Sequence, residues 1–501
     1  MKNQFKFLGL IAFAAAALCL SGCSKNDSAQ EKTTAIKKDY DICIYNTDTT
    51  IGSALRKMCD EYTEKTGLII RTITPTDDDN TIEHLESYID SEYFPDIFTV
   101  SSINELEKWK AKNAVWDFGN ATEDSFKTIT NNIPEYLKLS SNTADSFGIP
   151  YTIEGFGFIA DPKMIASLFG SDKYSAAIND LKECSFDEFR SFTEAVRAYV
   201  NGSGIYTFTL NGKNYSFKPE KTSLSKNLNS TFSVAANTPK NISMYLANSA
   251  LASVFKTAAA ANTANNEAIS SLSSPLVKFA ETLDLITLNL AGSTGSMGRG
   301  TEITSSSQNN STAAMKNFIN GKSVFLLAST QDYNSLATFN SLIAKRCVFI
   351  PIKMPIDESE ITSSPEIAKN LNRGLAVYAP KYYCINAKSS DKVKKYAQDF
   401  LTWTQTSDLA KKYIISEFGF TPYNTSDSSL IDNPLSRSML EYVSENRVLP
   451  TVYPGAPSTW CTEVFGKYLM EQYLTKISWI YQDYEAIAKY GIDKWKELKG
   501  D

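Results

Sequence analysis

Apolar residues along the chain form short runs that alternate with segments of helical periodicity. Residues 41–45 and 68–73 are two apolar runs with the composition of buried strands. The segment between them repeats apolar side chains on one face of a helix and ends at Gly67. Those apolar positions are Ile51, Leu55, Met58, Cys59 and Tyr62. A strand, a helix and a strand in this order predict a βαβ unit and a parallel sheet.

Polar residues directly follow the first of these strands. Ligands of parallel α/β sheets bind beyond the carboxyl ends of the strands. This rule makes Asn46, Asp48 and Thr49 candidate ligand-binding residues, with a solvated turn as the competing interpretation. A second polar run, residues 76–80, contains three successive aspartates ahead of a predicted helix. The acidic run suits the positive end of a helix dipole, and we favour that interpretation over a metal site.

The apolar stretch 147–161 contains a proline and three glycines. Pro150 cannot donate a hydrogen bond to a neighbouring strand, so a strand that stops there and resumes suits a crossover between two lobes. Residues 348–355 are also interrupted by proline and predict a second crossover. Glu154 has apolar neighbours, among which an ionised carboxylate needs a partner. The alternative is a bent edge strand in which Glu154 faces water.

Two further segments interrupt the α/β pattern. Residues 205–218 predict a β-hairpin insertion with Asn211-Gly212 at its turn. Residues 292–313 are rich in serine, glycine and asparagine, and they predict a mobile loop. The glycine-rich part of this loop lacks the Gly-Lys-Ser/Thr sequence of a phosphate-binding loop.

The N-terminus has the pattern of an exported protein. Two lysines precede an apolar run that is too short for a permanent membrane helix, which predicts a signal peptide over residues 1–22. Small residues directly before Cys23 resemble the bacterial lipobox, which implies cleavage before Cys23 and acylation of this residue. An ordinary signal peptide with an incidental cysteine is the alternative. Residues 23–38 are polar and predict a flexible tether.

Composition removes several classes of function. The net charge is −6, and it becomes −8 without residues 1–22 and their two lysines, so no nucleic-acid partner is expected. His84 is the only histidine, which excludes serine–histidine and cysteine–histidine catalysis unless His84 itself serves. The cysteines after Cys23 show no metal-binding spacing, and their disulfide state stays open. They are Cys43, Cys59, Cys184, Cys347, Cys384 and Cys461. We therefore expect no metal and no cofactor.

These pieces, in this order, resemble the extracellular solute-binding proteins of ABC importers, family 1, typified by the maltose-binding protein. The motifs that carry the resemblance are Lys65-Thr66-Gly67, Pro95-Asp96, Gly148-Ile149-Pro150-Tyr151, Asn320-Gly321-Lys322, Phe400-Leu401-Thr402-Trp403 and Gly419-Phe420-Thr421-Pro422. The resemblance covers essentially the whole mature chain. It implies an α/β periplasmic-binding-protein-like fold of type II, in which hinge strands join two lobes around a ligand cleft. By this analogy lobe 1 is 39–148 plus 353–388, and lobe 2 is 149–352 plus 389–501.

The resemblance also places a set of ligand-binding positions on this sequence. They are Asn46, Asp48, Thr49, Asp79, Ser101, Ser102, Glu154, Tyr333 and Trp460. Glu154 matches the carboxylate after the first crossover, whereas the family's frequent tryptophan is absent near Tyr333. Carboxylates, amides and aromatic faces in one cleft suit sugar recognition. We expect Trp460→Ala to weaken ligand binding and to leave folding intact.

The function implied by the resemblance is that of the binding lipoprotein of an ABC importer. Such a protein captures a small-molecule ligand, here a carbohydrate, by hinge closure and delivers it to the permease subunits. It is lipid-anchored on the outer side of the cytoplasmic membrane or at its periplasmic face, and it is not an enzyme. One alternative is a secreted glycosidase with Asp48 and Glu154 as its two carboxylates. Another is a surface sensor or adhesin built on the same scaffold.

Overall fold

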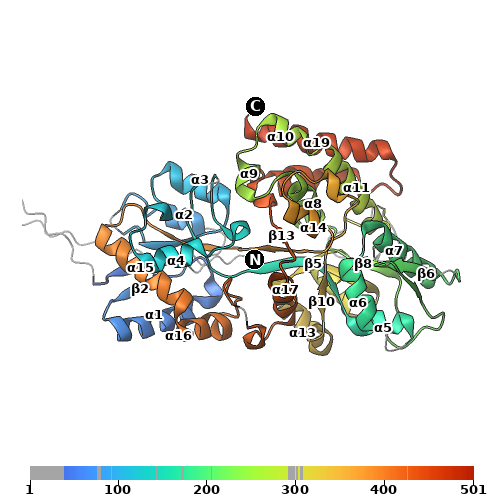
Figure 1. Ribbon diagram of the computed structural model, residues 1–501, viewed down its shortest axis with the longest axis horizontal. Coiled ribbons are helices and arrows are strands. Elements are labelled where there is room, and N and C mark those ends of the chain that lie inside the picture. The colour runs from blue at the N-terminus through green and yellow to red at the C-terminus, as the bar shows by residue number, and fades with distance from the viewer. Residues whose placement is uncertain are drawn as a thin grey trace, which may run out of the picture. The chain divides into compact units, whose positions relative to one another are not determined.

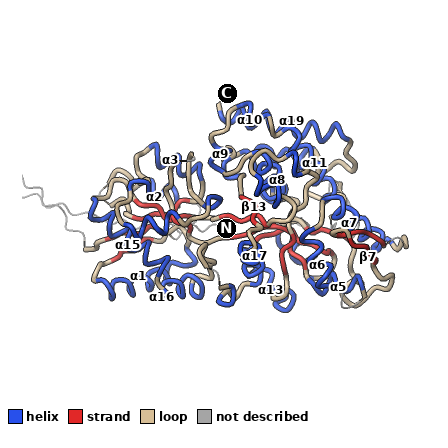
Figure 2. The backbone as a smooth tube through the Cα atoms, in the orientation of Figure 1, coloured by secondary structure: helices blue, strands red, loops and turns tan. Residues whose placement is uncertain are grey.

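The computed structural model describes residues 39–75, 81–91, 93–142, 144–170, 174–204, 206–290, 299–300, 303–304, 309–425 and 427–500. The predicted signal peptide, Cys23, the tether and Asp79 lie outside these ranges, as does most of the predicted loop 292–313. Residues Tyr40–Asp501 form one compact unit. Two mixed sheets organise this unit, and helices cover both of them (Figure 1 and Figure 2).

The first sheet has the strand order β2-β1-β3-β12-β4. Its strands are β1 (Ile42–Tyr45), β2 (Ile70–Ile73), β3 (Ile97–Val100), β4 (Ile149–Pro150) and β12 (Tyr382–Ile385). β1 pairs in parallel with both β2 and β3, which confirms the predicted βαβ unit. β12 runs antiparallel between β3 and β4.

Six helices share a hydrophobic core with the first sheet. They are α1 (Gly52–Thr66), α2 (Thr81–Glu86), α3 (Ile103–Ala111), α4 (Asp124–Asn131), α15 (Asp391–Thr406) and α16 (Asp408–Lys412). α1 buries the predicted apolar face, and Gly67 ends it with a φ of 76°, a conformation that glycine adopts without strain. Tyr62 of α1 packs against Phe400 and Trp403 of α15, with ring centroids 5.2 and 5.0 Å apart.

The second sheet has the strand order β13-β11-β5-β9-β8, and β10 also pairs with β5. Its strands are β5 (Glu154–Ala160), β8 (Ser230–Ser233), β9 (Ser323–Ser329), β10 (Val348–Ile350), β11 (Leu375–Tyr378) and β13 (Val448–Pro450). The central strand β5 is antiparallel to its three partners. β11 pairs with its first half and β10 with its second half.

Helices pack on both faces of the second sheet because the buried strand β5 is apolar on both sides. Phe156 and Phe158 face one core, and Ile159 faces the other. The helices of the first core are α5 (Pro162–Phe169), α6 (Tyr174–Glu183), α7 (Phe186–Asn201), α8 (Tyr245–Val254), α9 (Ala258–Asn262), α10 (Asn266–Ser270), α11 (Ser273–Thr287), α14 (Pro365–Asn370), α18 (Lys467–Gln472) and α19 (Tyr481–Lys499). Those of the other face are α12 (Ser311–Ile319), α13 (Tyr333–Ala344) and α17 (Pro434–Ser444).

The predicted hairpin is confirmed as β6 (Thr207–Leu210) and β7 (Lys213–Ser216), which form a separate two-stranded sheet. Asn211 and Gly212 at its turn have φ angles of 48° and 71°. Two successive left-handed residues match the twist of a tight hairpin, and asparagine and glycine tolerate this conformation best.

Three segments of the chain cross from one sheet to the other. The first, between β4 and β5, confirms the predicted crossover at Pro150. The others run between β11 and β12 and through residues near Thr421. Tyr151 N–H donates to the Lys381 carbonyl at 2.9 Å, and Ile153 N–H donates to the Thr421 carbonyl at 2.8 Å. The three crossings are therefore hydrogen-bonded side by side.

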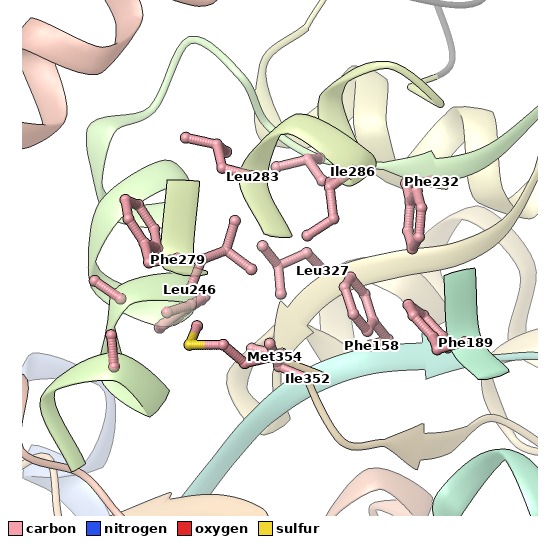
Figure 3. Packing of buried hydrophobic residues seen from close by; sticks show 14 of the residues in the cluster. Phe158, Phe189, Phe232, Leu246, Phe279, Leu283, Ile286, Leu327, Ile352 and Met354 are labelled. Carbon is pink, nitrogen blue, oxygen red and sulfur yellow. The ribbon is translucent and has the colours of Figure 1, made fainter. Parts of the chain in front are cut away.

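The predicted second crossover at 348–355 is wrong. β10 ends at Ile350, and Ile352 and Met354 are buried in the core between the second sheet and its helices (Figure 3). Proline ended the strand here, as expected, but the chain then continued into the core of the same sheet. The second crossing is instead at 379–381, where Pro380 separates β11 from β12.

The expected lobe boundaries also differ from the sheet membership. The resemblance places residues 353–388 in lobe 1, yet β11 pairs with β5 in the second sheet. It places residues 389–501 in lobe 2, yet α15 and α16 bury their apolar faces in the core of the first sheet. The apolar pattern shows that a segment is buried but does not identify the sheet that buries it.

Candidate functional site

A cavity of about 740 Å³ lies between elements of the two sheets, which is within the range of roughly 300–1,000 Å³ typical of small-molecule sites. We call its two sides the first wall and the second wall. The first wall comprises the cavity-lining residues in the ranges 101–104, 118–119, 130–142 and 144–146 around the first sheet. The second wall comprises cavity-lining residues in the ranges 240–259 and 451–462, with Gln331 and Tyr378. Ala379 and Pro380 of a crossing segment also line the cavity, which places it beside the crossings.

The first wall begins at the carboxyl end of β3. Ser101 and Ser102, two of the predicted ligand-binding residues, follow this strand directly and line the cavity. Ser101 donates its N–H and its hydroxyl to one carboxylate oxygen of Glu105, at 2.7 and 2.6 Å. The Ser102 hydroxyl caps α3 by accepting the Glu105 N–H. These bonds hold the loop after β3 in place at the edge of the cavity.

Both carboxylates of the first wall are paired with lysines. Asp145 lies 3.3 Å from Lys110, and Glu135 lies 2.7 Å from Lys256. The second pair joins the two walls, because Lys256 follows α8 of the second sheet. Asn104 of the first wall also donates its side-chain amide to the Ala456 carbonyl at 3.2 Å.

The second wall is built on aromatic rings. Phe156 of β5 stacks on Tyr245, with ring centroids 4.4 Å apart and an interplanar angle of 15°. The rings of Tyr378 and Tyr453 lie 6.0 and 6.2 Å from Phe156, and both line the cavity. The first wall also contributes an aromatic residue, Tyr136. Aromatic faces on both walls can pack against the C–H faces of a ligand.

Glu154 lies behind the second wall, with only 9% of its surface exposed. Its Oε1 accepts from the Gln331 amide and its Oε2 accepts from the Tyr378 hydroxyl, both at 2.7 Å. Burial raises the pKa of Glu154, while these hydrogen bonds and nearby Lys240 act in the opposite direction. Burial also raises the pKa of Tyr378 well above its usual range, so Tyr378 is a neutral phenol. Gln331, Tyr378 and Lys240 line the cavity, whereas Glu154 reaches it only through them.

Lys240 brings an ammonium group to the same wall. Its Nζ lies 5.3 Å from the centre of the Tyr245 ring. Burial lowers the pKa of Lys240, but Tyr245, Asp332 and Glu154 together raise it above its ordinary value. The side chain is therefore charged at neutral pH, facing one aromatic ring and two carboxylates.

A smaller cavity of about 260 Å³ is lined by Asp48 and Thr49, and Ser101 lines both this cavity and the main one. Asp48 caps the short helix after β1 by accepting from the Thr50 N–H and hydroxyl at 3.0 and 2.6 Å. Asn46 lines neither cavity, because it is fully buried and accepts the Tyr151 hydroxyl at 2.9 Å. Asp48 and Glu154, the two carboxylates of the glycosidase hypothesis, do not line one common cavity.

The two predicted aromatic contacts are both absent from the walls. Tyr333 begins α13 and packs against the core beneath the second sheet. Trp460 is completely buried, donates its indole N–H to the Gly491 carbonyl at 2.7 Å, and stacks on Phe465 with ring centroids 4.7 Å apart. Trp460 is therefore a core residue, and the prediction that it contacts a ligand is corrected. Its neighbours Cys461 and Thr462 line the cavity instead.

Sequence reasoning missed Tyr136, Lys240, Gln331, Tyr378 and Tyr453 as residues of the walls. Tyr378 stands two residues before Pro380, so the proline signal that identified the first crossover could also have identified this one. Lys240 and Gln331 carry no local signal, because their positions depend on packing between distant elements.

Three further observations limit the chemistry of the described residues. They contain no cluster of three or more His, Cys, Asp or Glu that could hold a metal ion. Within the same ranges, no helix combines the length and apolar character needed to cross a membrane. Their six cysteines are buried thiols rather than disulfides, and burial raises the pKa of Cys461, which lines the main cavity, to about 12.

Solved structures with the same fold come from bacterial binding proteins. The apo form of RafE from Streptococcus pneumoniae is 15% identical, with 91% of this chain and 97% of RafE covered, at a TM-score of 0.60. A family 1 extracellular solute-binding protein from Bifidobacterium longum subsp. infantis is 15% identical, with 91% and 98% covered, at a TM-score of 0.55. A Streptococcus pneumoniae solute-binding protein in complex with the blood group A-trisaccharide is 14% identical, with 91% and 99% covered, at a TM-score of 0.52.

No curated protein matches the chain. A family model does match it, over residues 57–431, which include four strands of the first sheet, the crossing segments and most of the second sheet. The description of that family is bacterial extracellular solute-binding protein. The two-sheet architecture, the three crossings and the cavity between the walls agree with this match, and the chain belongs to the bacterial extracellular solute-binding protein family.

Proposed function

We propose that the protein is the substrate-binding lipoprotein of an ABC importer and that its ligand is a carbohydrate. The ligand occupies the main cavity and contacts both walls. The observation that carries this proposal is the lining, which combines neutral serine, threonine and asparagine side chains with aromatic rings on both walls. Hydroxyl and amide groups can bond sugar hydroxyls, while the rings pack against sugar C–H surfaces.

Because the ligand contacts both walls, its binding is coupled to a change in the arrangement of the two walls. Only a ligand with different affinities for two arrangements can shift the balance between them. The crossing segments are three narrow connections between the sheets, and they supply the hinge of the proposal. Closure around the sugar creates the form that the permease subunits recognise.

The solved relatives support a carbohydrate as the ligand. RafE was solved with raffinose, and its structure aligns with this chain at 14% identity and a TM-score of 0.54. A chitin oligosaccharide binding protein aligns at 13% identity and a TM-score of 0.52. Together with the blood group A-trisaccharide complex, these sugars define a first panel of ligands.

Anchoring follows from the N-terminal sequence. Cleavage before Cys23 and acylation of this residue would hold the protein at the outer side of the cytoplasmic membrane, or at its periplasmic face, with residues 24–38 as the tether. Mass spectrometry of the protein purified from membranes tests this part, because acylation adds the mass of the lipid chains to Cys23. A Cys23→Ala variant should lack that mass and leave the membrane fraction.

A thermal-shift screen tests the ligand class. Residues 24–501 contain the whole compact unit, and they are screened against raffinose, a chitin oligosaccharide, the blood group A-trisaccharide and monosaccharides. A sugar at a hundredfold excess over its Kd stabilises the folded state by about 2.7 kcal/mol. Stabilisation with intact sugar recovered supports the binding protein, and stabilisation with cleavage products supports the glycosidase. No shift with any sugar contradicts the carbohydrate assignment.

A further inference from the structure

Glu154 holds two cavity-lining side chains without lining the cavity itself. Both of its carboxylate oxygens are occupied, one by the Gln331 amide and one by the Tyr378 hydroxyl. Burial raises the pKa of Glu154, while these two hydrogen bonds and nearby Lys240 oppose that effect and favour the ionised form. The carboxylate is thus well placed to control its two partners and poorly placed to contact a ligand.

The chemistry of these groups fixes the direction of each hydrogen bond. An ionised carboxylate only accepts, so Tyr378 must use its single hydroxyl hydrogen on Glu154. The Tyr378 oxygen keeps its lone pairs and can only accept from anything else. Gln331 must likewise turn its NH₂ group toward Glu154, which leaves its carbonyl oxygen on the opposite side of the amide.

We propose that Glu154 is a positioning residue that makes the Tyr378 oxygen an obligatory hydrogen-bond acceptor, so that the second wall selects a ligand with a hydroxyl or N–H donor at this point. A ligand that places an acceptor there meets a second acceptor and leaves both unpaired. The identification of the donor as a sugar hydroxyl rests on the proposed function. The fixed polarity of Tyr378 rests only on the contacts of Glu154.

The chain contains a matched pair of the same chemistry outside the cavity. Asp180 is 3% exposed and accepts from the Tyr215 hydroxyl, and neither residue lines the main cavity. Lys213 and Asn211 of the hairpin also donate to Asp180, at 2.8 and 3.1 Å. Asp180→Asn therefore replaces the buried carboxylate that accepts a tyrosine hydroxyl, as Glu154→Gln does, but it does so outside the main cavity.

The first experiment reads the hydrogen bond directly and needs no ligand. Residues 24–501 are labelled with ¹³C at the tyrosine Cζ, and Tyr378→Phe and Tyr215→Phe assign the two signals. We expect Glu154→Gln to move the Tyr378 signal toward the exposed tyrosines and to leave Tyr215 in place, with the reverse for Asp180→Asn. A Tyr378 signal that does not move in Glu154→Gln overturns the proposal.

The second experiment reads the selectivity. The panel sugar that stabilises the protein is compared with its deoxyfluoro analogues, in which fluorine replaces one hydroxyl and removes its donor. One analogue should bind the wild type about 10- to 100-fold more weakly than the parent sugar, and Glu154→Gln should reduce this ratio to a few-fold. Asp180→Asn should keep the full ratio. An unchanged ratio in Glu154→Gln overturns the proposal.

Two variants keep the test decisive. If Glu154→Gln does not fold, Tyr378→Phe removes the acceptor oxygen and should reduce the ratio in the same way, and an undiminished ratio overturns the proposal. If no panel sugar binds, the proposed function fails. The Cζ signal of Tyr378 in Glu154→Gln, compared with that in the wild type and in the Asp180→Asn control, still decides whether Glu154 sets the polarity of Tyr378.

Discussion

The two walls of the main cavity are built in different ways. Polar groups of the first wall bond to side chains of α3, as Ser101 does to Glu105 and Asp145 does to Lys110. The second wall contains tyrosine rings packed around Phe156 of β5, with one buried carboxylate behind them. Loops held by hydrogen bonds and ion pairs at the surface rearrange at lower cost than rings packed in a core. We therefore assign rigid recognition to the second wall and adjustment to the first.

The largest effect is expected from the tryptophans behind the two walls. Trp460 is fully buried behind the second wall, whereas Trp116 is partly buried behind Phe118 of the first. Trp460→Ala should lower the free energy of unfolding by about 3–5 kcal/mol, because it leaves a large cavity in the core. Trp116→Ala should lower the free energy of unfolding by clearly less, as measured by urea unfolding of both variants. Equal losses would show that the second wall has no more rigid support than the first.

The next effect concerns the rings that face the ligand. Tyr453→Ala should weaken sugar binding about 10- to 100-fold, or ~1.4–2.8 kcal/mol, because it removes a packed aromatic face. Tyr136→Ala should weaken it less, because the loop around Tyr136 can adjust. Calorimetric titration of both variants measures the difference. A larger loss for Tyr136→Ala would reverse the roles of the walls.

The pH dependence of stability separates the buried carboxylate of the second wall from its counterpart outside the cavity. Burial raises the pKa of Glu154 above its ordinary 4.5, so the folded wild type loses stability as the pH rises from 4.5 through the folded-state pKa. Glu154→Gln abolishes this loss. The free energy of unfolding of the variant, relative to that of the wild type, should therefore increase as the pH rises through this range.

Asp180 should show the opposite sign. Burial alone would raise its pKa, but hydrogen bonds from Lys213, Tyr215 and Asn211 hold the pKa below its ordinary 3.8. Asp180 therefore stabilises the fold above pH 3.8, and this contribution is lost as the pH falls through the folded-state pKa. Asp180→Asn should be less stable than the wild type near neutral pH and should converge with it in acid. Urea unfolding across this pH range tests both variants, and parallel curves would contradict the two assignments.

The smallest effect is expected from the ion pair that joins the walls. Glu135 and Lys256 are each about half exposed, so the pair is worth roughly 0.2–1 kcal/mol and is weakened by salt. Glu135→Gln should make the ligand-free protein slightly larger in solution scattering at low salt. The control is Glu123→Gln, which breaks the pair with Lys395 within the first sheet's core elements and should leave the size unchanged. The same increase in both variants would exclude a specific role for the pair between the walls.

The sequence predicted those parts of the fold that depend on local pattern. The βαβ unit at residues 41–73, the crossover at Pro150 and the hairpin are all present. It did not predict that β11 pairs in the second sheet or that α15 packs on the first sheet. Partners far apart in the sequence decide which sheet each element joins. Apolar periodicity reports burial and not the identity of the partner.

The cavities separate two groups of predicted site residues. Ser101 and Ser102, which the family resemblance indicated, line the main cavity. Asn46, Asp48 and Thr49, which the rule for parallel sheets indicated, do not line it, although Asp48 and Thr49 line the smaller one. Trp460 was misplaced, because a large aromatic residue can face either a core or a cleft and the sequence does not state which. The residues of the second wall come from four separate segments, and only packing brings them together.

The most direct test of the proposed binding mode is a crystal structure of the protein with the sugar identified in the screen. We expect the sugar to lie in the main cavity between Tyr136 and Tyr453, with one of its hydroxyls donating to the Tyr378 oxygen. A sugar bound only in the smaller cavity beside Asp48, or on the outer surface, would contradict it.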